Sequence, residues 1–197
     1  MELPIFPLNG AVLFPGTSLP LNIFEKRYVE MIDYALRTQR LIGMIQTDNN
    51  KKLYEVGCIG KIHSFNETSD GRYLISLSGE NCFKVVEEVG TKYSFRIVKL
   101  NQLENLKEKN SFTKSEKISL LEYYEKYIKI KNLNLDLKEI KGIDCDQLIK
   151  FIAMISPFKN IEKQALLESE SLKKFYLKLI SIIELEIASG EIGNTIN

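Results

Sequence analysis

Residues 3–28, LPIFPLNGAVLFPGTSLPLNIFEKRY, decide how the rest of this chain folds. Two turn signals, Asn9-Gly10 and Pro15-Gly16, separate three short apolar segments that lie around Pro4 and Pro7, at Val12–Phe14 and at Leu19–Ile23. Proline cannot donate a hydrogen bond to a sheet, so prolines at the ends of these segments favour short or edge strands. At Phe24 the apolar spacing changes from two to about 3.6 residues, which indicates that a helix begins there.

This predicted helix has a start signal and one apolar face. Asn22, followed three residues later by Glu25, matches a capping box. The apolar residues fall on one stripe, which we expect to be buried: Phe24, Tyr28, Met31, Ile32, Ala35 and Leu36. The charged residues between them face away from that stripe.

Short strands with a turn signal between each fill the chain as far as about residue 100. Ser69-Asp70-Gly71 and Ser78-Gly79-Glu80 are predicted turns, and Gly57 and Gly60 within one strand indicate a bulge or a close backbone approach. The predicted strands are Leu41–Gln46, Val56–Phe65, Tyr73–Leu77, Cys82–Val86 and a segment through Tyr93, Phe95 and Ile97. Their spacing is typical of a barrel or a rolled sheet, and we expect the lone helix to plug one end of it.

The second half of the chain has helical spacing throughout. Residues 101–110 are polar and charged and are predicted to be a linker. Capping boxes are predicted at Thr113 with Glu116, before a stripe of Ile118, Leu121, Tyr124 and Ile128, and at Asp144 with Gln147, before a helix that ends at Ser156-Pro157. A short helix at residues 161–167 and a long one at 171–189, with Gly190 as its C′ residue, complete an α+β order.

Several of these segments together resemble one known family, the substrate-binding domain at the N-terminus of ATP-dependent Lon proteases, which also occurs in cereblon and in small free-standing proteins. The resemblance starts with FPLNGAVLFPG, LPLNIFEKRY and MIDYAL. It continues in the same order through LIGMI, VGCIGKI, DGRY, LSGE with FKV, and EKQALLE at residues 162–168. It departs from the family at Leu172-Lys173-Lys174-Phe175, where the family usually has an Arg-Leu pair.

The resemblance implies both a fold and a function. The implied fold is α+β: an N-terminal PUA-like six-stranded pseudo-barrel with one helix at residues 1–100, a linker at 101–110 and an α-helical lobe at 111–197. The implied function is to hold unfolded or apolar segments of client polypeptides, in a protein of the free-standing kind. The family's ATPase and Ser–Lys protease domains are separate from this module, so it implies no enzyme activity.

Composition and targeting signals agree with a protein-binding role in the cytoplasm. The chain has 27 basic and 26 acidic residues, and this balance argues against nucleic acid as a partner. The start Met-Glu-Leu-Pro lacks the pattern of a signal peptide, and the longest apolar run, near residues 151–155, is too short to cross a membrane. Three cysteines without CxxC spacing are typical of reduced thiols. We therefore expect a cytoplasmic protein, and the oligomeric state stays open.

No set of residues predicts a catalytic centre, a cofactor or a metal site. A phosphate-binding GxxxxGK[ST] motif does not occur. His63, the only histidine, lies five residues from Cys58, and in a strand that odd separation places the two on opposite faces. One histidine and three scattered cysteines do not supply a zinc site.

Aromatic residues are the remaining candidates for binding. The candidate peptide-binding residues are Phe14, Phe65, Tyr73 and Tyr123. Phe14 either covers the barrel or meets a partner, and at least one of Tyr123, Tyr124 and Tyr127 should be exposed. We expect Tyr28 to belong to the core and Arg27 to pair with Glu25 or Glu30.

Two functions in different classes therefore stay open, with a third less favoured. A peptide-binding module would have measurable affinity for unfolded or apolar peptides. An adaptor would instead bind one folded partner, such as a protease or an ATPase. An RNA-binding role, suggested by the PUA-like fold, is less favoured because the lysines of residues 107–141 are interleaved with carboxylates, as on a solvated helix face.

Overall fold

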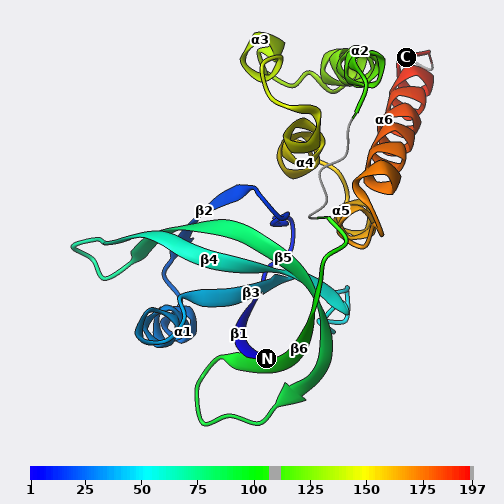
Figure 1. The fold of residues 1–197 in the computed structure, drawn as a ribbon. Helices are drawn as coiled ribbons and strands as arrows, with labels where there is room; N and C mark the ends of the chain where they lie inside the picture. The colour runs from blue at the N-terminus through cyan, green and yellow to red at the C-terminus, as the bar shows by residue number, and fades with distance from the viewer. Residues whose placement is uncertain (107–111, 196–197) are drawn as a thin grey trace.

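The computed structural model describes residues 1–106 and 112–195 of the chain, and these form six strands and six helices (Figure 1). The strands are β1 (Glu2–Pro7), β2 (Ser18–Ile23), β3 (Leu41–Ile45), β4 (Val56–Glu67), β5 (Tyr73–Val89) and β6 (Arg96–Leu103). The helices are α1 (Lys26–Arg37), α2 (Lys114–Lys131), α3 (Leu137–Ile140), α4 (Cys145–Ile155), α5 (Asn160–Leu167) and α6 (Leu172–Thr195). The strands and α1 gather on one side and the other helices on the other (Figure 1).

The six strands form one sheet that closes on itself. Their order is β2-β5-β4-β3-β1-β6, and β6 pairs with both β1 and β5. The β1–β3 pairing is parallel, and the other pairings are antiparallel. Strand β2 pairs with β5 from Ser18↔Ser78 to Ile23↔Tyr73 and lies at the edge of the sheet. One long edge of β2 is therefore left for contacts outside the sheet.

Glycine allows the closed part of the sheet to curve tightly around an apolar interior. A Cβ atom at Gly57 would lie 2.5 Å from the ring of Phe83, and the β4–β5 register shifts between Cys58 and Gly60. The close approach and the bulge predicted for this strand are thus confirmed. The side chains of this interior come from five strands: Leu3, Ile5, Ile45, Ile59, Phe83, Val98 and Leu100.

The strand predicted through Tyr93, Phe95 and Ile97 begins only at Arg96. Two other strand predictions are wrong, and both concern the same place. Val12–Phe14 is a buried loop and forms no strand. This loop packs against β5 at Gly79: the Gly16 amide donates to the Gly79 carbonyl (2.8 Å), and the Gly79 amide donates to the Thr17 carbonyl (2.8 Å). Ser78–Glu80 therefore does not turn the chain, because β5 continues through it to Val89.

Helix α1 begins later than the predicted capping box. Its N-cap is Glu25, with no side-chain capping bond, so the prediction of an Asn22 cap is wrong. Phe24 precedes the helix and is 66% exposed, whereas four residues of the expected stripe are buried: Tyr28, Met31, Ile32 and Ala35.

The helical part confirms one predicted cap and corrects other details. Thr113 and Glu116 form the capping box of α2, but the Asp144 side chain makes no capping bond to α4. The buried stripe of α2 consists of Leu120, Tyr124, Tyr127 and Ile128, while Ile118 is 55% exposed. Helix α6 does not end at Gly190 but continues to Thr195. Gly190 lies against Ile130 of α2, where a Cβ atom would approach to 2.3 Å.

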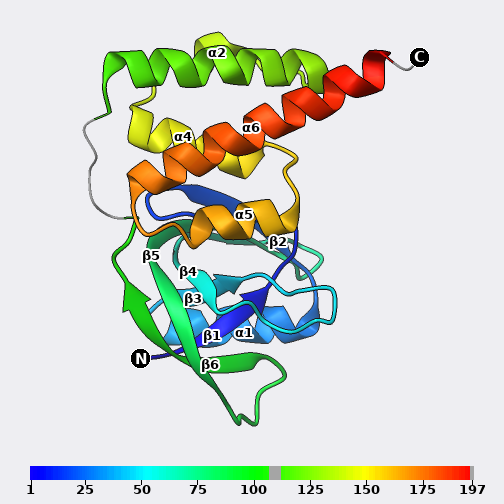
Figure 2. The ribbon, with the colours of Figure 1, turned by 90° about the vertical axis from the view of Figure 1, so that its right-hand side faces the viewer.

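The prediction of a linker over residues 101–110 is wrong at its start. Its first three residues belong to β6, and Asn81 donates to Gln102 across the strands at 2.8 Å. Residues 107–111 lie outside the described part of the chain. Figure 2 shows α5 lying against the strands, with α6 crossing above it toward α2.

Buried polar side chains join the strands to the helices. Gln46, the residue after β3, donates to the Gln164 side chain (3.1 Å), and Gln164 donates to the Val56 carbonyl (3.0 Å). Lys163 donates to the carbonyls of Gly10 (3.2 Å) and Met154 (3.1 Å). Because one apolar core cluster also runs through both parts, the two pack as a continuous interior.

Candidate functional site

A groove about 550 Å³ in volume lies between the edge of the sheet and helix α4. We call it the interlobe groove; its lining consists of Thr17, Ser18, Leu19, Pro20, Ile143, Gln147, Phe151, Met154 and Ile155. Apolar side chains from both parts of the molecule face it, and the polar side chains come from Thr17, Ser18 and Gln147. A concave apolar surface with a few polar groups is the usual form of a binding site.

The sheet side of the groove is the free edge of β2. Ser18 Oγ donates to the Leu77 carbonyl (3.3 Å) and lies 3.1 Å from Ser76 Oγ, which fixes the start of the strand on β5. Pro20 sits in the middle of β2 and has no N–H to offer. Proline is tolerated in an edge strand when its nitrogen faces away from the sheet, so the outer edge of β2 lacks a donor at its centre.

The helix side of the groove follows from the amphipathic sequence of α4. Leu148, Ile149 and Ile152 are fully buried, which turns the opposite side of the helix outward. Phe151, Met154 and Ile155 lie three and four residues apart on that side, and Ile155 is 42% exposed. The next residue, Ser156, is buried and hydrogen-bonded to the Tyr124 hydroxyl (3.1 Å), which anchors the end of the helix.

A buried lysine fixes the distance between the two walls. Lys150 of α4 is 5% exposed, and its Nζ donates to the carbonyls of Pro15 (2.8 Å) and Leu106 (3.2 Å). Burial lowers the pKa of Lys150 because removal from water disfavours the ammonium form. Gly16 adds a close contact, since a Cβ atom there would lie 3.1 Å from Gln147 Nε2.

The structure does not bring the four predicted aromatic residues together. Phe14 is completely buried, with its ring 5.2 Å from that of Phe175, so it is not available to a partner and the first of its two predicted roles applies: it packs under the helical part of the molecule. Tyr73 is 9% exposed and donates to Asp33 (3.0 Å), so it too is not the exposed aromatic we expected. Phe65 is 41% exposed and packs edge-on against Tyr73 at 4.8 Å.

Tyr123 is the partly exposed member of its cluster. Tyr124 and Tyr127 are each 1% exposed, which confirms that one of the three tyrosines remains at the surface. Tyr123 lies on α2 and does not line the interlobe groove. Two expectations for α1 are also confirmed: Tyr28 is in the core, and Arg27 pairs with Glu25 at 2.8 Å.

The groove residues were missed because no local pattern marks them. The sequence predicts Leu19 only as part of a strand, and Ile155 only as part of the helix that ends at Ser156-Pro157. Residues 17–20 and 143–155 meet across more than 120 positions of sequence, so only the packing of α4 brings them together. One sequence signal could have indicated the groove. Helix α4 has more apolar residues than a single buried face accommodates, so some of them must lie at the surface.

The only histidine lies apart from the two cysteines of the sheet. Cys58 and Cys82 are fully buried partners in the β4–β5 register, whereas His63 is exposed on β4. Burial raises the pKa of Cys82 to about 12 and that of Cys58 well above its ordinary value, so both thiols stay protonated at neutral pH. Within residues 1–106 and 112–195, no group of three or more His, Cys, Asp or Glu side chains could hold a metal ion.

Comparisons with known proteins agree on one family. A model of the ATP-dependent protease La (LON) substrate-binding domain matches residues 2–184. The chain is 26% identical to the Lon protease of Cytophaga hutchinsonii over 208 residues, and 26% identical to that of Flavobacterium johnsoniae over 208 residues. These alignments cover 99% and 100% of the chain but 25% of each relative, so the chain spans about a quarter of the length of these curated relatives.

Solved structures show the same fold. The structure of a Lon N-terminal domain protein from Xanthomonas campestris aligns with a TM-score of 0.69 and 19% identity, covering 92% of this chain and 98% of that one. The N-terminal domain of Mycobacterium avium complex Lon protease aligns with a TM-score of 0.65 and 16% identity, covering 93% and 98%. Among the described helices, none combines the length and the apolar content that crossing a membrane requires.

Proposed function

This chain belongs to the family of the ATP-dependent protease La (LON) substrate-binding domain, and from that premise we propose that its interlobe groove holds extended apolar segments of polypeptides. In this proposal the protein is a non-enzymatic binding module of the cytoplasm, without a cofactor. Its partners are unfolded or apolar segments of client proteins. The description of the matched family as substrate-binding supports a role in binding.

The observation that carries the proposal is the joint lining of the groove. Its volume of about 550 Å³ lies within the roughly 300–1,000 Å³ that is usual for binding pockets. Met154 is flexible and polarizable, and Phe151 and Ile155 are rigid apolar neighbours. Such a surface accepts apolar side chains of different shapes, as a binder of many unfolded segments must.

Pro20 determines how a bound segment would be held. Strand addition to a sheet edge takes its affinity from main-chain hydrogen bonds. The outer edge of β2 lacks a donor at Pro20, so a continuous ladder along it is interrupted. We therefore assign recognition to apolar side chains of the client that enter the groove between Leu19 and Met154.

Finer features of the fold and site belong to the same proposal. We infer that the closed sheet is of the PUA-like pseudo-barrel kind and that the chain divides into a barrel lobe, a linker and a helical bundle. Phe14, Tyr73 and Tyr123 then have a structural role, in which they stabilise the packing of the two lobes. Phe65, which lines a separate hollow with His63, is a second place where an apolar segment could bind.

Peptide titrations with groove variants test this function. A fluorescein-labelled unfolded polypeptide rich in apolar residues should bind the wild type, and Met154→Glu or Ile155→Asp should weaken binding about tenfold or more, because each places a charge against the apolar client. Leu185→Asp, at a 69% exposed position of α6, is the matched control and should bind like the wild type.

Each other outcome has a definite meaning. Equal binding by wild type and both groove variants would remove the groove from the function, and loss in Phe65→Asp alone would move the site to β4. No affinity for unfolded peptides, together with capture of a single folded protein, would favour an adaptor. Binding of RNA that falls steeply with salt would favour the nucleic-acid alternative.

A further inference from the structure

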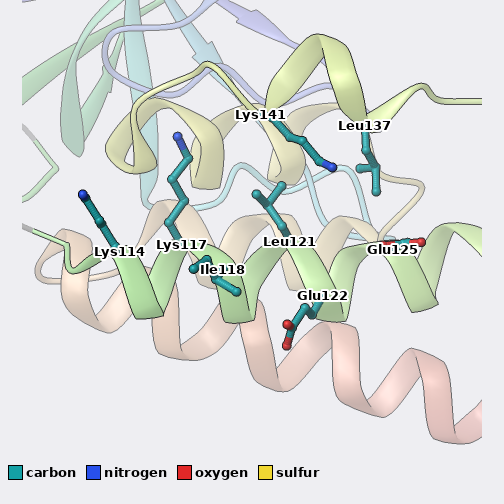
Figure 3. Close-up of a pocket in the computed structure, with 8 residues that line it drawn as sticks. All are labelled: Lys114, Lys117, Ile118, Leu121, Glu122, Glu125, Leu137 and Lys141. Carbon is teal, nitrogen blue, oxygen red and sulfur yellow. The ribbon is translucent and has the colours of Figure 1, made fainter.

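A second apolar groove runs along helix α2, on the helical side of the molecule. It is lined by a stripe of α2, with Leu137 and Lys141 beside it at α3 (Figure 3). We call this stripe the α2 stripe; it consists of Lys114, Lys117, Ile118, Leu121, Glu122 and Glu125. These positions follow the spacing i, i+3, i+4, i+7, i+8 and i+11, so they form one face of the helix.

The order of charges along the α2 stripe is its unusual feature. Lys114 and Lys117 lie at one end, Glu122 and Glu125 lie at the other, and the apolar pair lies between them (Figure 3). The two lysines are three residues apart, and so are the two glutamates. Like charges at this spacing destabilise a helix, and basic residues in the first turn oppose the helix dipole. Among its own six residues the α2 stripe therefore gains nothing from this separation of charge.

The stripe is instead complementary to a second copy of itself that runs in the opposite direction. Its midpoint lies between residues 119 and 120, and each residue has a counterpart at the same distance on the other side. Lys114 corresponds to Glu125, Lys117 to Glu122, and Ile118 to Leu121. A two-fold axis at this midpoint would place every lysine of one helix opposite a glutamate of an antiparallel copy, and would bring the apolar pairs together. Self-complementarity of this kind is what an isologous interface requires.

The stripe is also available for contact. Ile118 is 55% exposed, because the buried face of α2 is formed by other residues. Glu125 pairs with Lys129 at 2.8 Å, but both side chains are more than half exposed, and such a pair costs little to rearrange. Ile118 and Leu121 lie between groups of opposite charge, so a partner surface with the reverse order of charges would complement the stripe.

We propose that the α2 stripe is a homodimer contact, in which the α2 helices of two copies of this chain pack antiparallel about a two-fold axis. Lys117 of each copy meets Glu122 of the other, and Ile118 packs on Leu121. The contact is narrow, well below the roughly 1,200 Å² of a standard interface, so the dimer is weak and depends on concentration. This proposal does not depend on what the interlobe groove binds.

Charge reversal with mixing tests the geometry. Sedimentation velocity over a range of concentrations should show dimers of the wild type. Lys117→Glu alone, and Glu122→Lys alone, should each weaken self-association about tenfold, since each makes two like-charge contacts per dimer. An equimolar mixture of the two single variants should associate again, because both contacts then join opposite charges. The double variant K117E/E122K, which keeps the net charge, should also regain dimers.

The controls separate the interface from folding and from net charge. Lys61→Glu changes the charge at an exposed position of β4 and should leave the dimer unchanged. Circular dichroism should be the same for all variants, because the substituted side chains lie at the surface. A wild type that stays monomeric at the highest concentration overturns the proposal. So does a mixture of the two single variants that associates no better than either alone.

Discussion

Lys150 is the single residue that does most to set the shape of the interlobe groove. Its ammonium group is buried and donates to two backbone carbonyls, those of Pro15 and Leu106, which lie on the strand side of the molecule. Burial lowers its pKa, and the two carbonyls offset part of the cost of removing the charge from water. The position of α4 relative to β2 follows from these bonds.

Replacing Lys150 with methionine should therefore destabilise the fold. Methionine fills similar space but leaves the carbonyls of Pro15 and Leu106 without their donor. The free energy of unfolding should fall by about 1–3 kcal/mol, measured by urea denaturation. Lys61→Met, at an exposed position, should change it by less than about 0.5 kcal/mol. Equal stability of the two variants would contradict the structural role of Lys150.

The buried thiols should make stability depend on alkaline pH. The pKa of Cys82 is raised to about 12 in the folded chain, against an ordinary value near 9, and Cys58 shifts in the same direction. Above about pH 9 the unfolded chain loses these protons while the folded chain keeps them, so stability decreases as pH rises, by up to about 1.4 kcal/mol per pH unit and thiol.

Urea denaturation at pH 8 and pH 10 measures this dependence. Cys82→Ala should have a lower stability at pH 8 because it leaves a cavity, but a smaller loss between the two pH values than the wild type. The lowered pKa values of Lys150 and Lys163 act in the opposite direction. The Lys163 effect is the same in both proteins, whereas Cys82 is one of the groups that raise the pKa of Lys150, so the variant removes that coupling as well. An unchanged pH dependence in Cys82→Ala would show that this thiol keeps an ordinary pKa.

At the scale of single residues, the sequence predicted contacts between neighbouring residues better than it predicted which side chains are exposed. The Arg27 ion pair and the Thr113 cap depend on neighbours within three residues, and both predictions are confirmed. The core position of Tyr28, predicted from the apolar stripe of its helix, is confirmed too. The exposure of Phe14 depends on Phe175, which is remote in the chain, and its burial could not be predicted. The same holds for Lys150, whose sequence position gives no sign of its distant acceptors.

At the scale of elements, the close approach of the first loop to β5 at Gly79 is the feature that joins this loop to the sheet. A Cβ atom at Gly79 would lie 2.1 Å from the Phe14 carbonyl oxygen. Gly79→Ala should therefore push the loop from β5 and lower the free energy of unfolding by more than about 3 kcal/mol. Gly90→Ala is the matched control, because nothing lies within 4 Å of its added Cβ atom.

Thermal and urea denaturation of the two alanine variants provide the measurement. Gly90→Ala should unfold within about 0.5 kcal/mol of the wild type. A stable Gly79→Ala protein that keeps the wild-type groove would mean that the contact between this loop and β5 is not required.

The elements themselves were largely predictable, and the errors have physical causes. Turn signals and apolar spacing located β3, β4, α4 and α5 to within a few residues. Ser78–Glu80 has the composition of a turn. The same residues also fit a strand in which a glycine lets another backbone segment approach closely, and this is what Gly79 does. For α2, apolar residues occur on two faces, and sequence alone could not tell the buried stripe from the face that contains Ile118.

For the whole molecule, the order of strands before helices was enough to predict an α+β fold, and the ordered motifs identified the family. What sequence could not supply is the contact between β2 and α4, because residues that meet across the groove have no periodic relation. The division of the chain into lobes at residues 101–110 stays a prediction.

The shared core should make the whole chain unfold as one unit. Apolar residues from the strands and from the helices belong to one buried cluster, and polar bridges such as Gln46–Gln164 cross the same boundary. Far-ultraviolet circular dichroism and tyrosine fluorescence should give coincident urea transitions. Two separated transitions would mean that the strands and helices are independent domains joined by weak contacts.

The most direct test of the central claim is a nuclear magnetic resonance titration of the chain with an unfolded apolar peptide. Shift changes should concentrate on the backbone of Thr17–Leu19 and on the methyl groups of Met154 and Ile155, which face each other across the interlobe groove. In Ile155→Asp the same changes should require about tenfold or more peptide. Changes centred elsewhere, on Phe65 and the far ends of β4 and β5 for example, or no changes at saturating peptide, would contradict the assignment of the groove as the binding site.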